Sequence, residues 1–479
     1  MTAQGAAPTV ATARLLPGCT ALKPAAMLLR SALLVSSVLV PPMAAAQEAR
    51  PALEAVVIYR GATLIDGTGT APRAGMAVVT KGQDIALVAP VGQVPAELAR
   101  GATVVDASGL YILPGLIDTH VHLATVPNRK AEEALLRRAV YGGVTAERDM
   151  AGDTRALADL SRSALLGEIP APDIYYAALM AGPSFFKDPR TAASAKGDTP
   201  GEVPWMQAIT PATDLKVAVA LARGTGASAI KIYANLPADL VDGITREAHA
   251  QGFRVWAHAM VFPATPAEEI EAGVDVLSHA CMLAYQALPV KPTQYHDRAP
   301  VDSARIGNPD PILAGLFDGM KRHGQVLDAT VRVYAEGDKR WASQPNPPGS
   351  YCPGELAARI TAQAHAAGVA ISAGTDGETP AADAYPALHE ELELLVHQAG
   401  FTPLAAIQAG TQMGARALAL ESRMGTVAVG KLANLVFVAK DPTQDIANLR
   451  SVVYTVKRGR RYNRADFQPI APDEAGDVD

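Results

Sequence analysis

The chain has 479 residues, a net charge of −6 at pH 7 and 49% hydrophobic residues, a normal apolar content for a globular protein. This length is enough for two domains, or for one large barrel with an appended module. The sequence has no basic run and no interleaving of aromatic with basic residues, so it excludes the usual patterns of a nucleic-acid-binding protein.

The first 46 residues have the organisation of an export leader. Lys23 and Arg30 flank the apolar run Ser31–Val40, and Ala44–Ala46 provides a small-residue cleavage site. The apolar run is too short to span a bilayer comfortably, so we expect no stable membrane anchor. We therefore expect residues 1–46 to be removed and the mature protein to be exported, either to the periplasm or out of the cell.

Two alternatives for this leader remain open. Met27 is a possible start of translation in place of Met1, because the preceding residues make the leader unusually long. Leu16–Cys19 matches a lipoprotein box, although it lacks an apolar run in front. Three cysteines make no disulfide framework, and because Cys19 leaves with the leader, at most one bridge remains. Nothing in the sequence shows whether the other two, Cys281 and Cys352, pair.

Residues 47–112 consist of short apolar runs separated by turn signals. Similar strand-like runs return near the other end of the chain. The strand-like segments are residues 56–59, 76–79, 85–88, 103–106, 435–438 and 452–456. We expect residues 47–112 and 425–465 to form one small β-sandwich domain in which both ends of the chain meet. Residues 466–479 follow as an acidic tail, which we expect to be loose.

Residues 113–424 alternate short strands with helical stretches, the pattern of βα units around a parallel sheet. Eight such repeats are the number that closes a (β/α)8 barrel. The expected strands are residues 113–122, 144–148, 174–179, 228–233, 254–258, 274–279, 325–330 and 369–373. The predicted fold is therefore α/β, a TIM-like barrel that carries the β-sandwich module.

Three connections in the barrel are much longer than the usual few residues, namely 184–210, 282–311 and 331–353. Each follows a strand, so each lies on the face where barrel enzymes keep their active sites. Such loops are commonly lids or specificity loops. Disordered insertions are the alternative.

The first barrel strand ends in His120-Val121-His122. Residues two apart in a strand point to the same face, so the two imidazoles lie side by side. Neutral imidazole is the commonest nitrogen ligand for zinc and related metals. Taken alone, the pair is a weak indication of a metal site, because ordinary surface or core histidines explain it equally well.

Later strands also end in polar residues. They are Lys231 on strand four, His258 on strand five, His279 on strand six and Asp376 after strand eight. A barrel gathers these strand ends at one mouth. Either histidine alone would be explained as an interior residue, and Asp376 as a turn or N-cap residue. Convergence of all six residues is hard to explain by packing, so together they predict a metal centre.

Lys231 is the hardest of these residues to explain by structure alone, because burial of an unpaired ammonium group costs free energy. A desolvated lysine loses its proton readily. Its neutral amine can take up CO2 as a carbamate, which supplies an anionic two-oxygen ligand between two metals. That chemistry would give this buried lysine a function.

Several segments of the chain match the motifs of a known family. They are residues 113–122, Gly143–Asp149, Ile230–Tyr233, Ala257–His258, Ser278–His279, Ala373–Asp376, Ala409–Thr411 and Gly425–Leu435. With these motifs the chain resembles the amidohydrolase superfamily, in its dipeptidase-, carboxypeptidase- and imidazolonepropionase-like branch. Two segments depart from the family pattern without removing a ligand: Ser278-His279-Ala280 and Ala433-Asn434-Leu435.

The resemblance implies roles for the six polar residues. His120, His122 and Asp376 would hold the first metal ion, His258 and His279 the second, and carboxylated Lys231 would bridge the two. Zinc is the expected metal from these ligands, with manganese or cobalt as alternatives. Two divalent ions can share a hydroxide and polarise a substrate carbonyl.

Three residues are candidates for the chemistry itself. Asp376 is the natural general base, which takes a proton from the water and passes it to the leaving nitrogen. Tyr233 shares the strand face of Lys231; partly from the resemblance, we expect it to donate a hydrogen bond to the oxyanion, with a packed aromatic ring as the alternative. Arg148 pairs either with a substrate carboxylate or with Asp149 or Glu147.

These expectations describe an exported binuclear metal hydrolase that cleaves the amide (C–N) bond of a dipeptide or N-acyl amino acid. A lactonase or phosphotriesterase at the same site is the second hypothesis. Deamination is less favoured, since that branch of the superfamily usually uses one metal and lacks the strand-four lysine. A metal-free scaffold protein is the non-enzymatic alternative. The partner is a small-molecule amide, and a homo-oligomer remains open.

Overall fold

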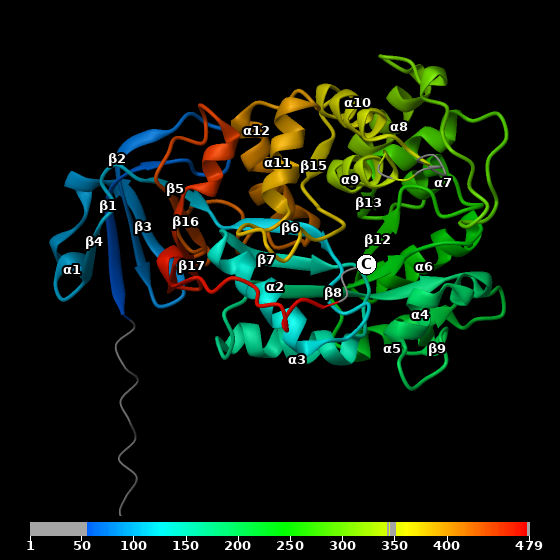
Figure 1. The fold of residues 1–479 in the computed structure, drawn as a ribbon, viewed down its shortest axis with the longest axis horizontal. Helices are drawn as coiled ribbons and strands as arrows, with labels where there is room; N and C mark the ends of the chain where they lie inside the picture. Colours follow the sequence, from blue (N-terminus) through cyan, green and yellow to red (C-terminus); the bar gives the residue numbers. More distant parts are fainter. Residues whose placement is uncertain (1–54, 343, 345–350, 477–479) are drawn as a thin grey trace, which may run out of the picture. The chain divides into compact units, whose positions relative to one another are not determined.

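The structure is a computed structural model, and it describes residues 55–342, 344 and 351–476. The expected leader, including Cys19, lies outside the described residues. Within them, a β-sheet made from both ends of the chain adjoins a barrel of parallel strands and helices (Figure 1). No helix in the described part of the chain is both long and apolar enough to cross a membrane.

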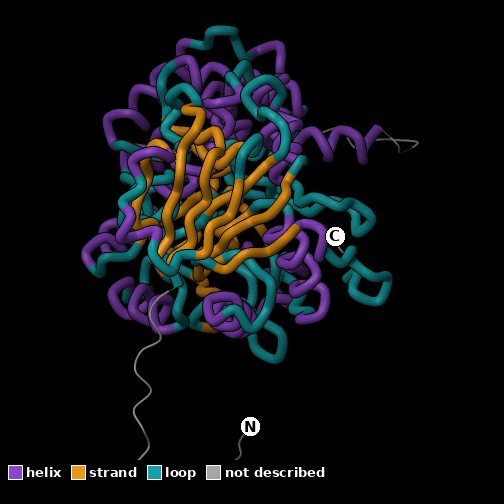
Figure 2. The backbone as a smooth tube through the Cα atoms, turned by 90° about the vertical axis from the view of Figure 1, so that its left-hand side faces the viewer, coloured by secondary structure: helices purple, strands orange, loops and turns teal. Residues whose placement is uncertain are grey.

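The sheet contains eight strands, seven of which form one continuous hydrogen-bonded path. They are β1 (Val56–Leu64), β2 (Arg73–Lys81), β3 (Asp84–Pro90), β4 (Thr103–Asp106), β5 (Tyr111–Pro114), β16 (Leu435–Val438), β17 (Val452–Lys457) and β18 (Arg460–Asn463). The order is β18-β17-β16-β5-β1-β2-β3, with β4 beside β1, so the two chain ends meet where β5 pairs with β16. Figure 2, which views the molecule from the left-hand side of Figure 1, shows these strands lying side by side.

Aromatic rings from both chain ends form the core beneath this sheet. The ring centroid of Phe437 lies 4.9 Å from that of Tyr59 and 4.3 Å from that of Tyr454. All three residues are buried. The predicted association of the N-terminal and C-terminal strands is therefore confirmed, and aromatic packing stabilises it.

The barrel has the eight parallel strands that the sequence predicted. They are β6 (Leu116–Val121), β7 (Val144–Asp149), β8 (Asp173–Ala181), β11 (Ala229–Ile232), β12 (Arg254–His258), β13 (Val276–Ser278), β14 (Val326–Asp328) and β15 (Ala370–Ser372). Each pairs with the next in chain order. Helical crossovers connect successive parallel strands, as in other (β/α)8 barrels.

Helices follow the barrel strands and cover the outside of the barrel. They include α2 (Arg129–Tyr141), α3 (Thr154–Leu166), α5 (Leu215–Gly224), α6 (Ala238–Ala250), α7 (Pro266–Glu271), α8 (Pro311–His323), α10 (Gly354–Ala366), α11 (Leu388–His397), α12 (Pro403–Gln408) and α13 (Gly414–Ala417). Several begin at aspartate N-caps, of which Asp310 accepts from the backbone amides of Ile312 and Leu313. Such caps satisfy the free amides of the first turn.

The barrel closes between its first and last strands with few backbone hydrogen bonds. Across this seam, Thr119 N donates to Ala373 O at 3.1 Å and Asp376 N donates to His120 O at 2.9 Å. Side chains add further bonds, because Asp118 accepts from both the backbone and the hydroxyl of Thr375. The seam is therefore joined largely by residues that flank the predicted metal ligands.

The chain passes from the sheet into the barrel at Gly115. Its amide donates to Asn434 O at 2.9 Å in the C-terminal segment. A Cβ atom at this position would lie 2.7 Å from Cβ of Thr145 and closer still to the threonine hydroxyl and methyl groups. Only glycine permits this close approach between the first two barrel strands.

The three long connections contain ordered elements, so the alternative of disordered insertions is wrong for their described parts. The first carries α4 (Pro189–Ser194) with the short strands β9 (Glu202–Val203) and β10 (Met206–Ala208), the second begins with the 3-10 helix Ala280–Ala287, and the third begins with α9 (Val331–Ala342). A Cys281–Cys352 disulfide, with Cα atoms 6.3 Å apart, ties the second connection to the end of the third.

The expectation of a loose acidic tail is wrong for residues 466–476. Glu474 pairs with Arg137 of α2 at 2.7 Å, and Asp473 pairs with Lys130 at 2.5 Å. The Phe467 ring lies 5.9 Å from that of Tyr141, also in α2. The described part of the tail thus packs along one helix through charge and aromatic contacts.

Candidate metal centre

The six predicted ligands converge at the carboxyl ends of the barrel strands. Nε2 of His120 and Nε2 of His122 lie 3.4 and 3.1 Å from the same Asp376 carboxylate oxygen. Ligand atoms of these three residues all lie within 4.8 Å of one another, which is compact enough to hold one metal ion. His122 remains 31% exposed, so solvent reaches the group from that side.

The other two histidines continue this cluster inward. His279 Nδ1 lies 3.6 Å from Asp376 Oδ2, and its ring centroid is 4.9 Å from that of His120. The His258 ring follows at 4.7 Å from His279. His279 and Asp376 both have positive φ angles, 75° and 49°, which is backbone strain of the kind found at functional sites.

Lys231 lies in the barrel interior with no exposed surface, and its Nζ has no hydrogen-bond partner among the residues that the structure describes. Burial, followed by the positive charge of Arg148, lowers the pKa of Lys231 to about 7. His258 Nδ1 is likewise buried without a partner. Buried polar atoms are normally satisfied, so these unpaired nitrogens fit a site completed by a metal ion and a carboxylated lysine.

The environment keeps Asp376 ionised. Burial opposes ionisation, but His120, the hydrogen bond from His122 and the nearby His279 outweigh it and hold the pKa of Asp376 well below its usual range. The carboxylate can therefore both coordinate a cation and accept a proton from water.

Asp328 is a central residue that the sequence reasoning missed. It ends β14 with no exposed surface, and its two oxygens accept hydrogen bonds from Thr119, His120, Arg148 and Ser278 at 2.8, 2.8, 2.9 and 2.9 Å. The available signal was its position, because it is an acidic residue inside the seventh predicted strand, residues 325–330.

The prediction for Arg148 needs correction. Its guanidinium has no exposed surface, and its ion pair is with Asp328 and not with Asp149 or Glu147. It also donates to Thr119 O and stacks over the ring of Trp256, with 4.5 Å between the guanidinium carbon and the ring centroid. A guanidinium so enclosed contacts no substrate, and it acts on the centre through Asp328.

Tyr233 lies beside the ligands, as its position two residues after Lys231 predicted. Its ring centroid is 4.1 Å from that of His258, and the Phe185 ring stacks on it at 4.4 Å. Burial and the neighbouring Tyr295 raise the pKa of Tyr233 well above its usual value. The phenol therefore keeps its proton and remains a hydrogen-bond donor.

The long connections bring further aromatic and charged side chains to the site, which the sequence did not identify. Tyr295 of the second connection lies 5.5 Å from Tyr233 between ring centroids, and the Arg298 guanidinium stacks on Tyr295 at 3.9 Å. Tyr334 of α9 approaches His279 at 6.5 Å. None of these three residues ends a barrel strand, so the strand pattern of the sequence did not predict their place at the site.

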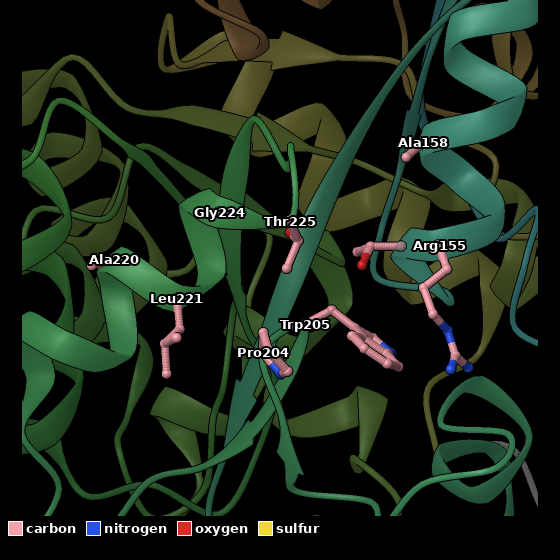
Figure 3. Close-up of a pocket in the computed structure, with 9 residues that line it drawn as sticks. Arg155, Ala158, Pro204, Trp205, Ala220, Leu221, Gly224 and Thr225 are labelled. Carbon is pink, nitrogen blue, oxygen red and sulfur yellow. The ribbon is translucent and has the colours of Figure 1, made fainter. Parts of the chain in front are cut away.

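A separate cavity of about 390 Å³ lies on the outside of the barrel between α3, α5 and the segment before β10 (Figure 3). Arg155 stacks on Trp205 at its wall and is paired with Asp153 and Asp198. The cavity contains none of the predicted ligands. The metal centre at the strand ends is therefore the candidate active site.

A model of the amidohydrolase family matches residues 111–462. The chain belongs to this family. The match covers the barrel and the C-terminal strands of the sheet, and it confirms the resemblance drawn from the motifs.

Solved structures of similar fold include amidohydrolase-type enzymes. A Xaa-Pro dipeptidase with bound methionine has a TM-score of 0.66 and 21% identity, covering 85% of this chain and all of that one. Ochratoxinase from A. niger has a TM-score of 0.68 and 21% identity, covering 88% and 99%. At this identity the likeness establishes the fold alone.

A curated relative matches over a much shorter segment. Adenine deaminase from Rubrobacter xylanophilus is 37% identical over 78 residues, which are 16% of this amidohydrolase chain and 12% of the deaminase. The match thus spans only a small part of that relative's length.

Proposed function

We propose that this protein is a binuclear metal-dependent hydrolase of the amide (C–N) bond of a dipeptide or N-acyl amino acid. One observation carries the proposal: the fully buried amine of Lys231, which has no hydrogen-bond partner among the described residues, lies close to the ionised Asp376 and to three histidines, His120, His258 and His279. The similar folds of a Xaa-Pro dipeptidase and of molinate hydrolase support a hydrolytic reaction.

In this proposal His120, His122 and Asp376 would hold one metal ion, and His258 and His279 would hold the other. The neutral amine of Lys231 would take up CO2, with formation of an N–C bond and release of a proton, and the resulting carbamate would supply a further anionic ligand. Bound divalent ions supply Lewis acidity and lower the pKa of water.

Side chains of the protein then accept and donate the protons of the reaction. Asp376 accepts a proton from the attacking water and delivers it to the leaving nitrogen, because its carboxylate is ionised at neutral pH. Tyr233 donates its phenolic hydrogen to the developing oxyanion on the substrate. The ring of Tyr295 and the side chains of the long connections contact the rest of the substrate.

The test is hydrolysis of a panel of dipeptides and N-acyl amino acids by the zinc-loaded chain, with metal content measured in the same samples. The panel also contains a lactone, a phosphotriester and adenine, the last because of the short deaminase match. Amide turnover that is lost in Lys231→Ala supports the proposal. Lys457→Met is the matched control, since Lys457 is also a buried lysine but pairs with Asp173, away from the centre.

The other outcomes decide against the proposal in distinct ways. Turnover of a lactone, a phosphotriester or adenine without amide turnover would replace the proposed bond by another. A chain that binds no metal would remove the catalytic mechanism altogether.

A further inference from the structure

Asp328 forms a closed polar cluster directly behind the first metal ligand. Oδ2 accepts from His120 Nδ1, Arg148 Nη2 and Ser278 Oγ, and Oδ1 accepts from Thr119 Oγ1. All of these side chains are buried, and the charges of Asp328 and Arg148 balance each other. A buried ion pair of this type needs further hydrogen bonds to offset its desolvation, and this one has them.

The donor pattern determines the state of the His120 ring. Arginine has no acceptor, and an ionised carboxylate has no donor. The Asp328 carboxylate can therefore bond His120 Nδ1 only if that nitrogen carries a proton. In the neutral ring the lone pair then lies on Nε2, the atom 3.4 Å from the Asp376 carboxylate.

We propose that Asp328 is the positioning residue of the first metal ion, and that it holds His120 in the tautomer and orientation in which Nε2 binds the metal. Arg148 and Ser278 orient the Asp328 carboxylate. This assigns a role to Ser278, where the chain departs from the usual family pattern, and a role to the buried Arg148 that involves no substrate. The inference rests on the proposed metal-dependent function.

The first test measures metal affinity in Asp328→Asn. A carboxamide is neutral and has one acceptor oxygen, so Asp328→Asn leaves the Arg148 charge without its counter-charge and replaces one of the two acceptor oxygens by an NH2 group. Loss of such an outer partner typically weakens metal binding about 10- to 100-fold. We expect a loss of this size for one metal equivalent, measured by competition with a chelating dye, and altered visible absorption bands in the cobalt-loaded variant.

Asp173→Asn is the matched control. Asp173 is a buried carboxylate at the start of β8, paired with Arg458 at 2.8 Å and Lys457 at 2.9 Å. It lies at the opposite end of a barrel strand from the metal centre, so we expect lower stability with unchanged metal affinity and an unchanged cobalt spectrum. Equal effects of the two variants on metal binding would reduce Asp328 to a purely structural role and overturn the inference.

A second measurement does not depend on any position-328 variant folding. Nitrogen-15 NMR of the histidine-labelled, zinc-loaded chain should show His120 with a proton on Nδ1 and the metal on Nε2, with the signal assigned by its absence in His120→Asn. Metal bound through Nδ1 would overturn the inference and leave the proposed function intact. A wild-type chain that binds no zinc would instead overturn the proposed function itself.

Discussion

Tyr233 is the side chain whose single oxygen atom bears most directly on the proposed reaction. We expect Tyr233→Phe to lower kcat about 10²- to 10³-fold with little change in KM, the usual effect of removing one oxyanion donor. Steady-state kinetics on the best amide substrate checks this. Tyr285→Phe is the control, because the Tyr285 hydroxyl donates to Ala299 O. Unchanged kcat in Tyr233→Phe would leave the ring with a packing role only.

His389 in α11 makes stability depend on pH through one buried imidazole. Burial lowers the pKa of His389 to about 3, and its Nε2 bonds Gly142 O at 2.8 Å. The folded chain therefore binds fewer protons here than the unfolded chain between about pH 6.5 and pH 3, so stability falls as pH falls through that range.

We expect the protonation of His389 in the unfolded chain to lower the unfolding free energy of the wild type by about 2 kcal/mol when the pH falls from 7 to 5. His389→Gln keeps an amide donor without the titration, so the wild type should lose stability relative to the variant by that amount. Urea unfolding at both pH values measures the difference. Parallel pH dependence in the two proteins would contradict the assignment.

The sequence identified the six candidate ligands because each is a polar residue in the last part of an apolar strand or just after it. The same reasoning does not identify the ion-pair partner of Arg148. Sequence pattern offers only chain neighbours such as Asp149 and Glu147 as partners, whereas Asp328 is 180 residues away and meets Arg148 only because the barrel closes. Local pattern therefore identifies which residues are unusual but not which distant residue satisfies them.

At the scale of elements, the loop after β15 depends on a glycine. A Cβ at Gly374 would lie 2.7 Å from Cβ of His120 and closer still to Asp328 Oδ1. We expect Gly374→Ala to lower the unfolding free energy by about 1–3 kcal/mol, as overpacking does, and to weaken metal binding. Thermal unfolding and metal titration check both effects.

Gly315→Ala is the control for this substitution. Gly315 lies within α8, and a Cβ there would meet nothing within 4 Å. Alanine should be neutral or stabilise the helix by up to about 1 kcal/mol. Normal metal binding by Gly374→Ala would show that the loop can move away from the ligands at no cost.

The sequence did not predict the ordered elements within the long connections. Strand periodicity and turn signals placed all eight barrel strands, whereas the order within residues 184–210 or 282–311 comes from contacts with distant segments. Asn235, for example, accepts from Tyr295 N at 2.8 Å and donates to Ser184 Oγ at 3.0 Å. Such contacts have no sequence period.

At the scale of the whole molecule, the sheet and the barrel should unfold together. Lys457 of β17 pairs with Asp173 at 2.9 Å and donates to Ala164 O at 2.6 Å, both in the barrel part of the chain. Phe437→Ala removes a fully buried ring from the sheet core and should cost about 3–5 kcal/mol.

Tryptophan fluorescence measures this coupling cleanly. The three tryptophans, Trp205, Trp256 and Trp341, all lie between residues 113 and 424, so their signal follows the barrel alone. We expect Phe437→Ala to lower the urea midpoint of this signal. An unchanged midpoint would mean that the barrel is stable without the sheet.

If the predicted ligands hold a metal ion, their position at the barrel seam gives them a second role in barrel closure. His120 and His122 come from one edge of the seam and Asp376 from the other, and the two strands share few backbone bonds. A cation held by all three residues would cross-link the first strand to the last. Stripping the protein of metal should then speed amide hydrogen exchange at Thr119 and Asp376 more than in the middle strands. In this molecule metal binding would then determine the stability of barrel closure as well as the catalytic activity.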